Sequence, residues 1–182
     1  MTTVSQVGSD VIRQKAVPVD FPLSEQDVQI VRNLIEQMRA NDLVGMAAPQ
    51  IGQSRRIFVT EVRRTKFRDS GLDPLRVFVN PSIENASSET QTAYEGCGSV
   101  AESNLFGEVE RPKKIAVKWQ SEDGSHQTAE FEGFIARIIQ HELDHLDGIV
   151  FLDRIKTTKT VMSGIEFQKA FGPKSNDKDS EP

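Results

Sequence analysis

Apolar residues recur at helical spacing near the start of the chain. In residues 24–40 they fall on one face of a helix: Val28, Val31, Leu34, Ile35 and Met38. Ser24 can cap this helix through its hydroxyl, and the acidic residues Glu25 and Asp27 suit the positive end of the helix dipole. The pattern therefore predicts an N-terminal helix that ends at Asn41.

A second amphipathic pattern covers residues 133–147. Its apolar residues form a stripe made of Phe134, Ile135, Ile138, Ile139 and Leu146. Gly148 follows at the position where a glycine commonly ends a helix. We therefore predict a helix here, and a further short helix at 158–170.

Strand-like segments occupy much of the remaining chain. They are rich in β-branched and aromatic residues and cover 56–62, 75–80, 115–120 and 127–132. The turn residues 122–124 join the last two segments as a hairpin. Residues 43–52 are small and contain Pro49, which favours extended or turn structure.

This order of elements predicts an α+β fold. We expect antiparallel sheets packed around the helix at 133–147, with the N-terminal helix beside them. One domain should cover residues 1–171, because no segment within it has the composition of a long linker. Residues 172–182 are charged and poor in apolar groups, so we expect a disordered tail.

Composition and charge exclude several classes of protein. The chain has 182 residues and a formal net charge of −5, so it lacks the basic excess that nucleic acids or anionic membranes attract. No apolar run is long enough to span a bilayer. Cys97 is the single cysteine, which excludes an intrachain disulfide. With no recognisable targeting segment, the expected location is the cytoplasm.

The helix at 133–147 also carries chemistry. His141 and His145 are four residues apart, so both imidazoles project from one face and can bind one metal ion. Glu142, next to the first histidine, can reach a water on that metal and take its proton. Together these residues predict a metal-dependent hydrolase.

The third metal ligand distinguishes between classes of enzyme. The long protease motif would require histidine at position 151, but this position is Phe151. Glu166 could complete the site of a zinc peptidase, and Cys97 could instead supply a thiolate. Paired with the two histidines, Cys97 is the favoured ligand. His126 lies beside the predicted hairpin turn, where we expect it to be solvated.

Three segments together resemble the peptide deformylases. The family motifs GxGLAAPQ, EGCLS and QHExDHxxG correspond to Leu-Val-Gly-Met-Ala-Ala-Pro-Gln at 43–50, Glu-Gly-Cys-Gly-Ser at 95–99 and Gln-His-Glu-Leu-Asp-His-Leu-Asp-Gly at 140–148. Their order and spacing match as well, and the similarity extends to about Arg154. Three motifs in register are far more specific than the histidine helix alone.

The resemblance implies an enzyme that removes the formyl group from the N-terminal methionine of new polypeptides. It implies that Cys97, His141 and His145 bind iron(II), which zinc, nickel or cobalt can replace. Glu142 would move the proton, while the Gln50 side chain and the Gly98 backbone N–H would donate to the formyl oxygen.

The resemblance also implies a substrate cleft and a set of partners. Gly45 would pair with an extended substrate, and Val44 and Ile138 would line a pocket for the methionine side chain. The expected partners are N-formylmethionyl peptides and, transiently, the ribosome, with no direct contact to nucleic acid or membrane. Glu95 and Asp144 are expected to support the metal ligands, and Arg111 is a candidate partner of Asp144.

Departures from the family motifs leave alternatives open. Leu43 replaces a glycine and is expected to narrow the cleft, Met46 replaces a leucine, and Gly98 replaces a leucine where only the backbone is needed. The segment 101–108 lacks the arginine that commonly helps hold substrate. A zinc peptidase using Glu166, or an inactive metal-binding relative, remains an alternative hypothesis.

Overall fold

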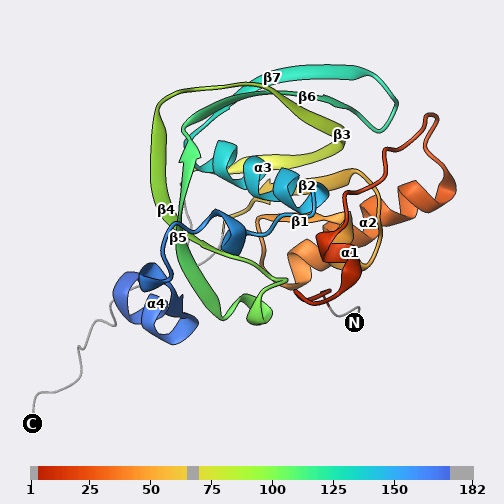
Figure 1. Ribbon diagram of the computed structural model, residues 1–182. Helices are drawn as coiled ribbons and strands as arrows, with labels where there is room; N and C mark the ends of the chain where they lie inside the picture. Colours follow the sequence, from red (N-terminus) through yellow and green to blue (C-terminus); the bar gives the residue numbers. More distant parts are fainter. Residues whose placement is uncertain (1–3, 65–69, 173–182) are drawn as a thin grey trace, which may run out of the picture.

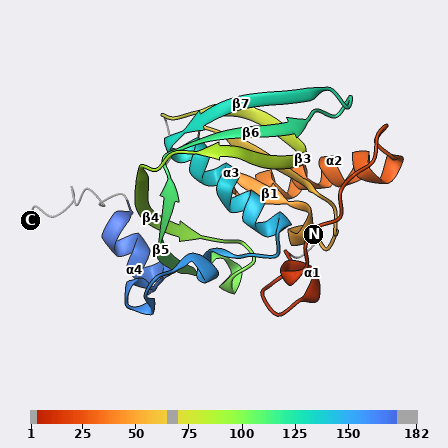
Figure 2. The ribbon, with the colours of Figure 1, turned by 45° about the horizontal axis from the view of Figure 1, so that its top comes forward.

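Two antiparallel sheets enclose the helix that carries the paired histidines. The computed structural model describes residues 4–64 and 70–172 of the chain. In these residues the larger sheet has the strand order β1-β2-β3-β6-β7, and the smaller sheet has the order β4-β5-β8. Helix α3 (Gly133–Leu146) lies between the two sheets (Figure 1, Figure 2). The predicted α+β class is confirmed.

The larger sheet separates two hydrophobic clusters. Its strands are β1 (Gly45–Ala47), β2 (Ile57–Val62), β3 (Asp73–Ala86), β6 (Lys114–Gln120) and β7 (His126–Glu132). Because side chains alternate along a strand, Phe58 and Phe78 belong to the cluster with α3, whereas Val59 and Val79 belong to the other cluster. Each of the four strands predicted from the sequence is present, and the β6–β7 hairpin turns at Gly124, as predicted.

Helix α2 (Glu25–Ala40) covers the second face of the larger sheet. Its buried side chains, which include Val31, Leu34 and Met38, pack in the same cluster as Val59 and Val79. The Ser24 hydroxyl accepts a hydrogen bond from the Asp27 backbone N–H, so the predicted cap is confirmed.

The smaller sheet was largely missed by the sequence analysis. It consists of β4 (Thr90–Gly96), β5 (Leu105–Pro112) and β8 (Met162–Ser163). Glycine and charged residues interrupt the apolar pattern of β4 and β5, because these strands surround a polar site and not a continuous core. Alternation nevertheless holds: Glu95 and Cys97 face α3, and Tyr94 contacts Phe167 of α4 (Gly164–Phe171).

The helix predicted at 158–170 is wrong in its first part. Residues Thr158–Thr160 form a 3-10 turn, Met162–Ser163 pair with β5, and only then does α4 begin. Ser163 explains the late start, because its side chain accepts from the Glu166 N–H as an N-cap. Gly172 ends α4, and the predicted tail beyond it lies outside the described residues.

Short helical elements connect the longer segments around α3. Helix α1 (Asp10–Arg13) and the 3-10 turns Ala48–Ile51, Ala101–Ser103 and Phe151–Arg154 connect the larger elements. The stretch 43–52 is extended and then turns, as predicted, with the turn in 3-10 form. At the end of α3, Gly148 has a φ of +74° and lies against the Arg13 carbonyl, where a Cβ would collide.

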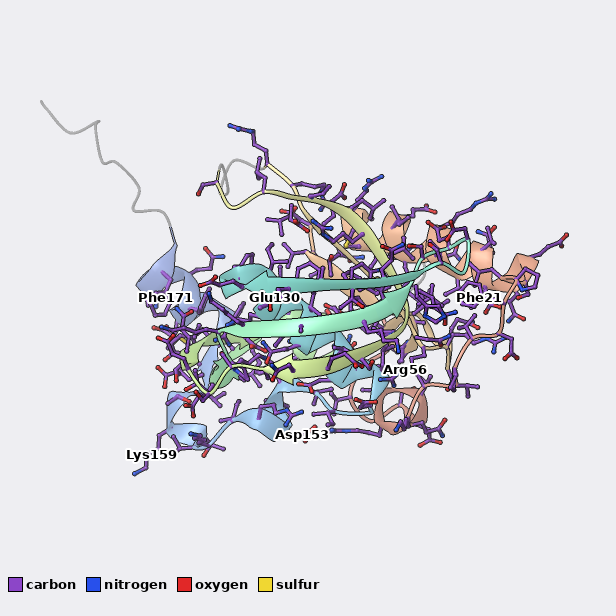
Figure 3. The ribbon with its side chains drawn as sticks, turned by 90° about the horizontal axis from the view of Figure 1, so that it is seen from above. Phe21, Arg56, Glu130, Asp153, Lys159 and Phe171 are labelled. Atoms are coloured by element: carbon purple, nitrogen blue, oxygen red, sulfur yellow. The ribbon has the colours of Figure 1, made fainter. Side chains whose placement is uncertain are left out.

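Two further observations concern the molecule as a whole. Seen from above, Phe21 and Phe171 lie at opposite ends of the fold, with the long strands between them (Figure 3). Within residues 4–64 and 70–172, none of the helices has the length and apolar character required to cross a bilayer.

The cap of α2 gives a first testable prediction. Replacing Ser24 by alanine should lower the free energy of unfolding by about 1 kcal/mol, because the Asp27 N–H loses its partner. Urea denaturation measures this change. Ser24→Thr keeps a hydroxyl and should recover most of the loss, and equal losses for both variants would contradict the assignment of the cap.

Candidate metal centre and active site

The three predicted metal ligands meet between the two sheets. One ligand atom from each of Cys97, His141 and His145 lies within 4.8 Å of the others. Both histidines lie on α3, one turn apart, and Cys97 directly follows β4. The Cys97 Sγ and the His145 Nε2 are 3.1 Å apart. The helix spacing and the edge of the smaller sheet together bring these atoms to one point.

The Cys97 and His141 side chains stabilise opposite charges on each other. Burial alone would raise the pKa of the Cys97 thiol, but the His145 and His141 rings lower it well below its ordinary value. Burial would likewise lower the pKa of His141, but Cys97 and Glu95 raise it well above its ordinary value. The site thus favours a thiolate beside positive charge. A thiolate and two imidazoles are ligands that bind zinc and iron well.

Glu95 orients the first histidine. Its Oε2 is 2.9 Å from the His141 Nδ1, which leaves the Nε2 of that ring for a metal ion. Burial opposes ionisation of Glu95, but hydrogen bonds from Arg111 and His141 hold the pKa of this carboxyl well below its usual range. Glu95 is therefore a buried anion.

Two buried arginines neutralise Glu95. Arg111 donates through Nε at 2.7 Å and through Nη2 at 2.9 Å, a bidentate arrangement. Arg137, on α3, donates through Nη1 at 2.7 Å. Arg111 also donates to Asp144 at 2.9 Å, so the predicted Arg111–Asp144 pair is present. The sequence analysis missed Arg137, because a charged residue on an amphipathic helix is more often solvated.

Glu142 faces the cavity above the ligands. It is 4% exposed, and its Oε2 is buried with no hydrogen-bond partner among residues 4–64 and 70–172. Burial raises its pKa to about 7. A buried carboxylate oxygen of this kind can accept a proton from a water in the cavity, as a general base requires.

Gly45 leaves room for that carboxylate. A Cβ at this position would lie 2.4 Å from the Glu142 Oε1, so any side chain would displace the acid. Gly45 also lies on β1, the edge strand of the larger sheet. The Val44 carbonyl accepts from the Glu61 N–H on β2, so by alternation the Gly45 backbone groups point to the free edge.

Gln50 is aimed at the same cavity. Its Oε1 accepts from the Ala47 N–H at 2.8 Å, which directs its amide nitrogen towards Cys97 and Ser99, at 3.8 and 3.4 Å. The side chain is buried, although a glutamine beside Pro49 would by itself suggest a solvated turn. Gly98, next to Cys97, also lines the cavity.

The cavity has a volume of about 160 Å³ and lies between the free edges of β1 and β4, with α3 beneath it. Val44 and Ile138 line it, as predicted from the family resemblance. Its wall also includes Tyr94, Phe134 and Arg137, which the sequence analysis did not place there. Phe134 was expected on the buried stripe of the helix, but it is 50% exposed at the mouth of the cavity.

The remaining candidates lie elsewhere. Glu166 is exposed on α4 and pairs with Lys169, so the structure does not bring it to the histidines. His126 is exposed at the start of β7, as expected. These positions remove the basis for the zinc peptidase alternative.

A thiolate, two histidines and a buried acid beside a cavity define the class of metal-dependent hydrolases. The chain matches the polypeptide deformylase family over residues 1–161, and therefore belongs to that family. It is accordingly a hydrolase that removes the N-formyl group from nascent polypeptides.

Similar proteins support this assignment across most of the chain. The peptide deformylase of Thermotoga neapolitana is 41% identical over 89% of this chain and 92% of its own length. That of Fusobacterium nucleatum is 39% identical over 84% and 82%. Among solved structures, the Thermotoga maritima peptide deformylase has a TM-score of 0.75 at 39% identity, with 86% and 99% of the two chains covered.

A further solved structure contains a peptide. The class I type b peptide deformylase from Acinetobacter baumannii, bound to Met-Ala-Ser, has a TM-score of 0.78 at 36% identity. The match covers 85% of this chain and 99% of that chain.

The buried charge network around Glu95 gives the second prediction. Glu95→Gln should destabilise the fold by about 3–5 kcal/mol, because Arg111 and Arg137 lose the anion that neutralises them in a buried site. It should also weaken metal binding by about 10–100-fold, because His141 loses its orienting partner. Urea denaturation and metal titration measure the two effects.

A surface carboxylate provides the matched control. Glu110 lies on β5 and pairs with Lys156, whose side chain is 79% exposed. Glu110→Gln should change the unfolding free energy by less than about 1 kcal/mol and leave metal binding intact. If both variants behaved alike, the network around Glu95 would have no special role.

Proposed function

We propose that Cys97, His141 and His145 hold one divalent metal ion and that Glu142 acts as the general base of a peptide deformylase. The observation that supports this most strongly is the meeting of three potential ligand atoms beside a buried carboxylate oxygen that none of the described residues hydrogen-bonds. We expect iron(II) as the metal, as the family resemblance implies. Zinc, nickel or cobalt are expected as replacements, because the affinity order of these metals is much the same at most thiolate and imidazole sites.

The substrate is an N-formylmethionyl peptide. Its backbone would add to the free edge of β1 beside Gly45, in the manner of an extra strand. The methionine side chain would enter the cavity beside Val44 and Ile138. The Met-Ala-Ser peptide in the similar Acinetobacter baumannii structure agrees with this class of ligand.

The residues around the metal position would divide the chemistry. When bound, the ion would supply a Lewis acid that activates water and polarises the formyl oxygen. Glu142 takes the proton from the attacking water and returns it to the amine nitrogen as the bond to the formyl carbon breaks. The Gln50 amide and the Gly98 backbone N–H donate to the formyl oxygen, where negative charge develops in the transition state. Formate and a free amino terminus result.

The proposed donor at position 98 does not depend on the leucine of the family motif. Gly98 has only its backbone to contribute, so the absence of the family's leucine side chain does not remove the donor.

Transient contact with the ribosome and a cytoplasmic location stay predictions for this chain.

Glu142 provides the third prediction. Glu142→Gln should reduce kcat by about 10²–10⁴-fold, because the amide cannot accept the proton from water. Metal content should stay at the wild-type level, since Glu142 is not a ligand. Formate release from formyl-Met-Ala-Ser by protein loaded anaerobically with iron(II) measures the rate. Glu130→Gln, an exposed carboxylate on β7, is the control and should keep full activity.

Cys97 provides the fourth prediction. Cys97→Ala should weaken metal binding by more than about 100-fold. Losses up to roughly 100-fold are typical of residues that only support a metal ligand. Metal analysis after dialysis measures this loss. His126→Ala removes a histidine outside the site and should keep the metal. If Cys97→Ala retained both metal and activity, the thiolate would not be a ligand and the proposed function would fail.

A further inference from the structure

The side chain of Leu43 occupies the space above Gly98. A Cβ at Gly98 would lie 3.3 Å from the Leu43 Cδ1 and 3.6 Å from the Val4 Cγ1. The first of these distances is shorter than most contacts made by a real Cβ. The φ of Gly98 is outside the left-handed region, so its backbone alone does not require glycine. A side chain at position 98 would therefore have to displace the end of the Leu43 side chain.

Both sides of this contact are held by hydrogen bonds. The Leu43 N–H donates to the Met38 carbonyl at the end of α2, at 2.9 Å, and the Leu43 carbonyl accepts from Arg63 at 3.3 Å. On the other side, the Gly98 carbonyl accepts from the Gln6 side chain at 2.8 Å. Neither backbone can move away without losing a partner, so a larger side chain at 98 would compete directly with Leu43.

The contact lies between the catalytic cavity and a neighbouring groove. Leu43 and Gly98 line both of them. The groove is otherwise formed by the N-terminal segment, the end of α2 and the turn at Ala101–Ser103, and α3 contributes nothing to it. Leu43 is thus part of the wall that separates the two spaces.

The direction in which the substrate side chains point connects the wall at Leu43 with the specificity for the peptide substrate. Along an extended peptide, successive side chains point to opposite sides. In the proposed binding mode the methionine side chain points towards α3, where Phe134 and Ile138 line the cavity. The side chain of the second residue then points away from α3, towards Leu43 and the groove.

We propose that Leu43 is a specificity-determining residue that limits the size of the second residue of the substrate by closing the cleft above Gly98. This inference rests on the proposed function. It predicts a preference for formyl-methionyl peptides with a small second residue, and it predicts that the residues at 43 and 98 act as a pair.

Two substrates test the preference. For wild type and Leu43→Ala, we would compare kcat/KM for formyl-Met-Trp-Ser with that for formyl-Met-Ala-Ser, using iron(II)-loaded protein. Leu43→Ala should raise this ratio by at least about tenfold, because one extra or missing methylene in a hydrophobic pocket already discriminates by roughly 10–200-fold. Leu23→Ala is the control, since Leu23 packs against the same hydrophobic cluster but does not line the cavity, and it should keep the wild-type ratio.

A double-mutant cycle tests the contact without turnover. Gly98→Leu should lower the Tm of the wild-type protein, because the new side chain meets Leu43 and Val4. The same substitution in Leu43→Ala should lower the Tm by much less, since the competing methyl groups are gone. Equal losses in both backgrounds would overturn the pairing.

The possible failures can be told apart. An unchanged substrate ratio in Leu43→Ala, with an active wild-type enzyme, would overturn the specificity role and leave the proposed function intact. A wild-type protein that binds iron(II) but releases no formate from either peptide would overturn the proposed function, and this inference with it.

Discussion

The buried carboxylate of Glu95 is the constraint on which the site depends. It accepts hydrogen bonds from Arg111 and Arg137 and faces the Nδ1 of His141. Through these contacts one anion joins β4, β5 and α3. Removing charges from water is costly, so such a group is retained only where its partners satisfy it fully. Here the satisfied network holds the smaller sheet against the helix and orients His141, a proposed metal ligand, at the same time.

The position of the cavity follows from this arrangement of the two sheets around α3. The free edges of β1 and β4 face each other across α3, and each edge contributes backbone groups that an extended peptide can use. The helix supplies both histidines and Glu142 from below. Sheet edges are usually protected from other chains. In the proposed binding mode both edges are used for binding, and the glycine at 45 leaves room for the Glu142 carboxylate between them.

Members of one family can keep a site while exchanging the residues around it. Leu43 and Gly98 both differ from the family motif, and the Leu43 side chain lies where a side chain at position 98 would begin. Because the interior is closely packed, a larger side chain at one of these positions is compatible with a smaller one at the other. The two departures from the family motif, which seemed independent in the sequence, are thus related in space. They change the side chains in the wall of the cleft and not the reacting groups.

The sequence by itself determined the helices at 24–40 and 133–147 and four strands, because hydrophobic periodicity is local. Local spacing also put His141, Glu142 and His145 on one helix, whereas Cys97 is distant in sequence and only the fold brings it beside them. The sequence did not reveal β4 and β5, whose pattern is broken by the polar site they surround. It also missed Arg137 as a partner of Glu95 and placed Phe134 on the wrong face. Which charges are buried and which apolar groups line a cavity depends on the elements packed against them. Only the tertiary structure decides that.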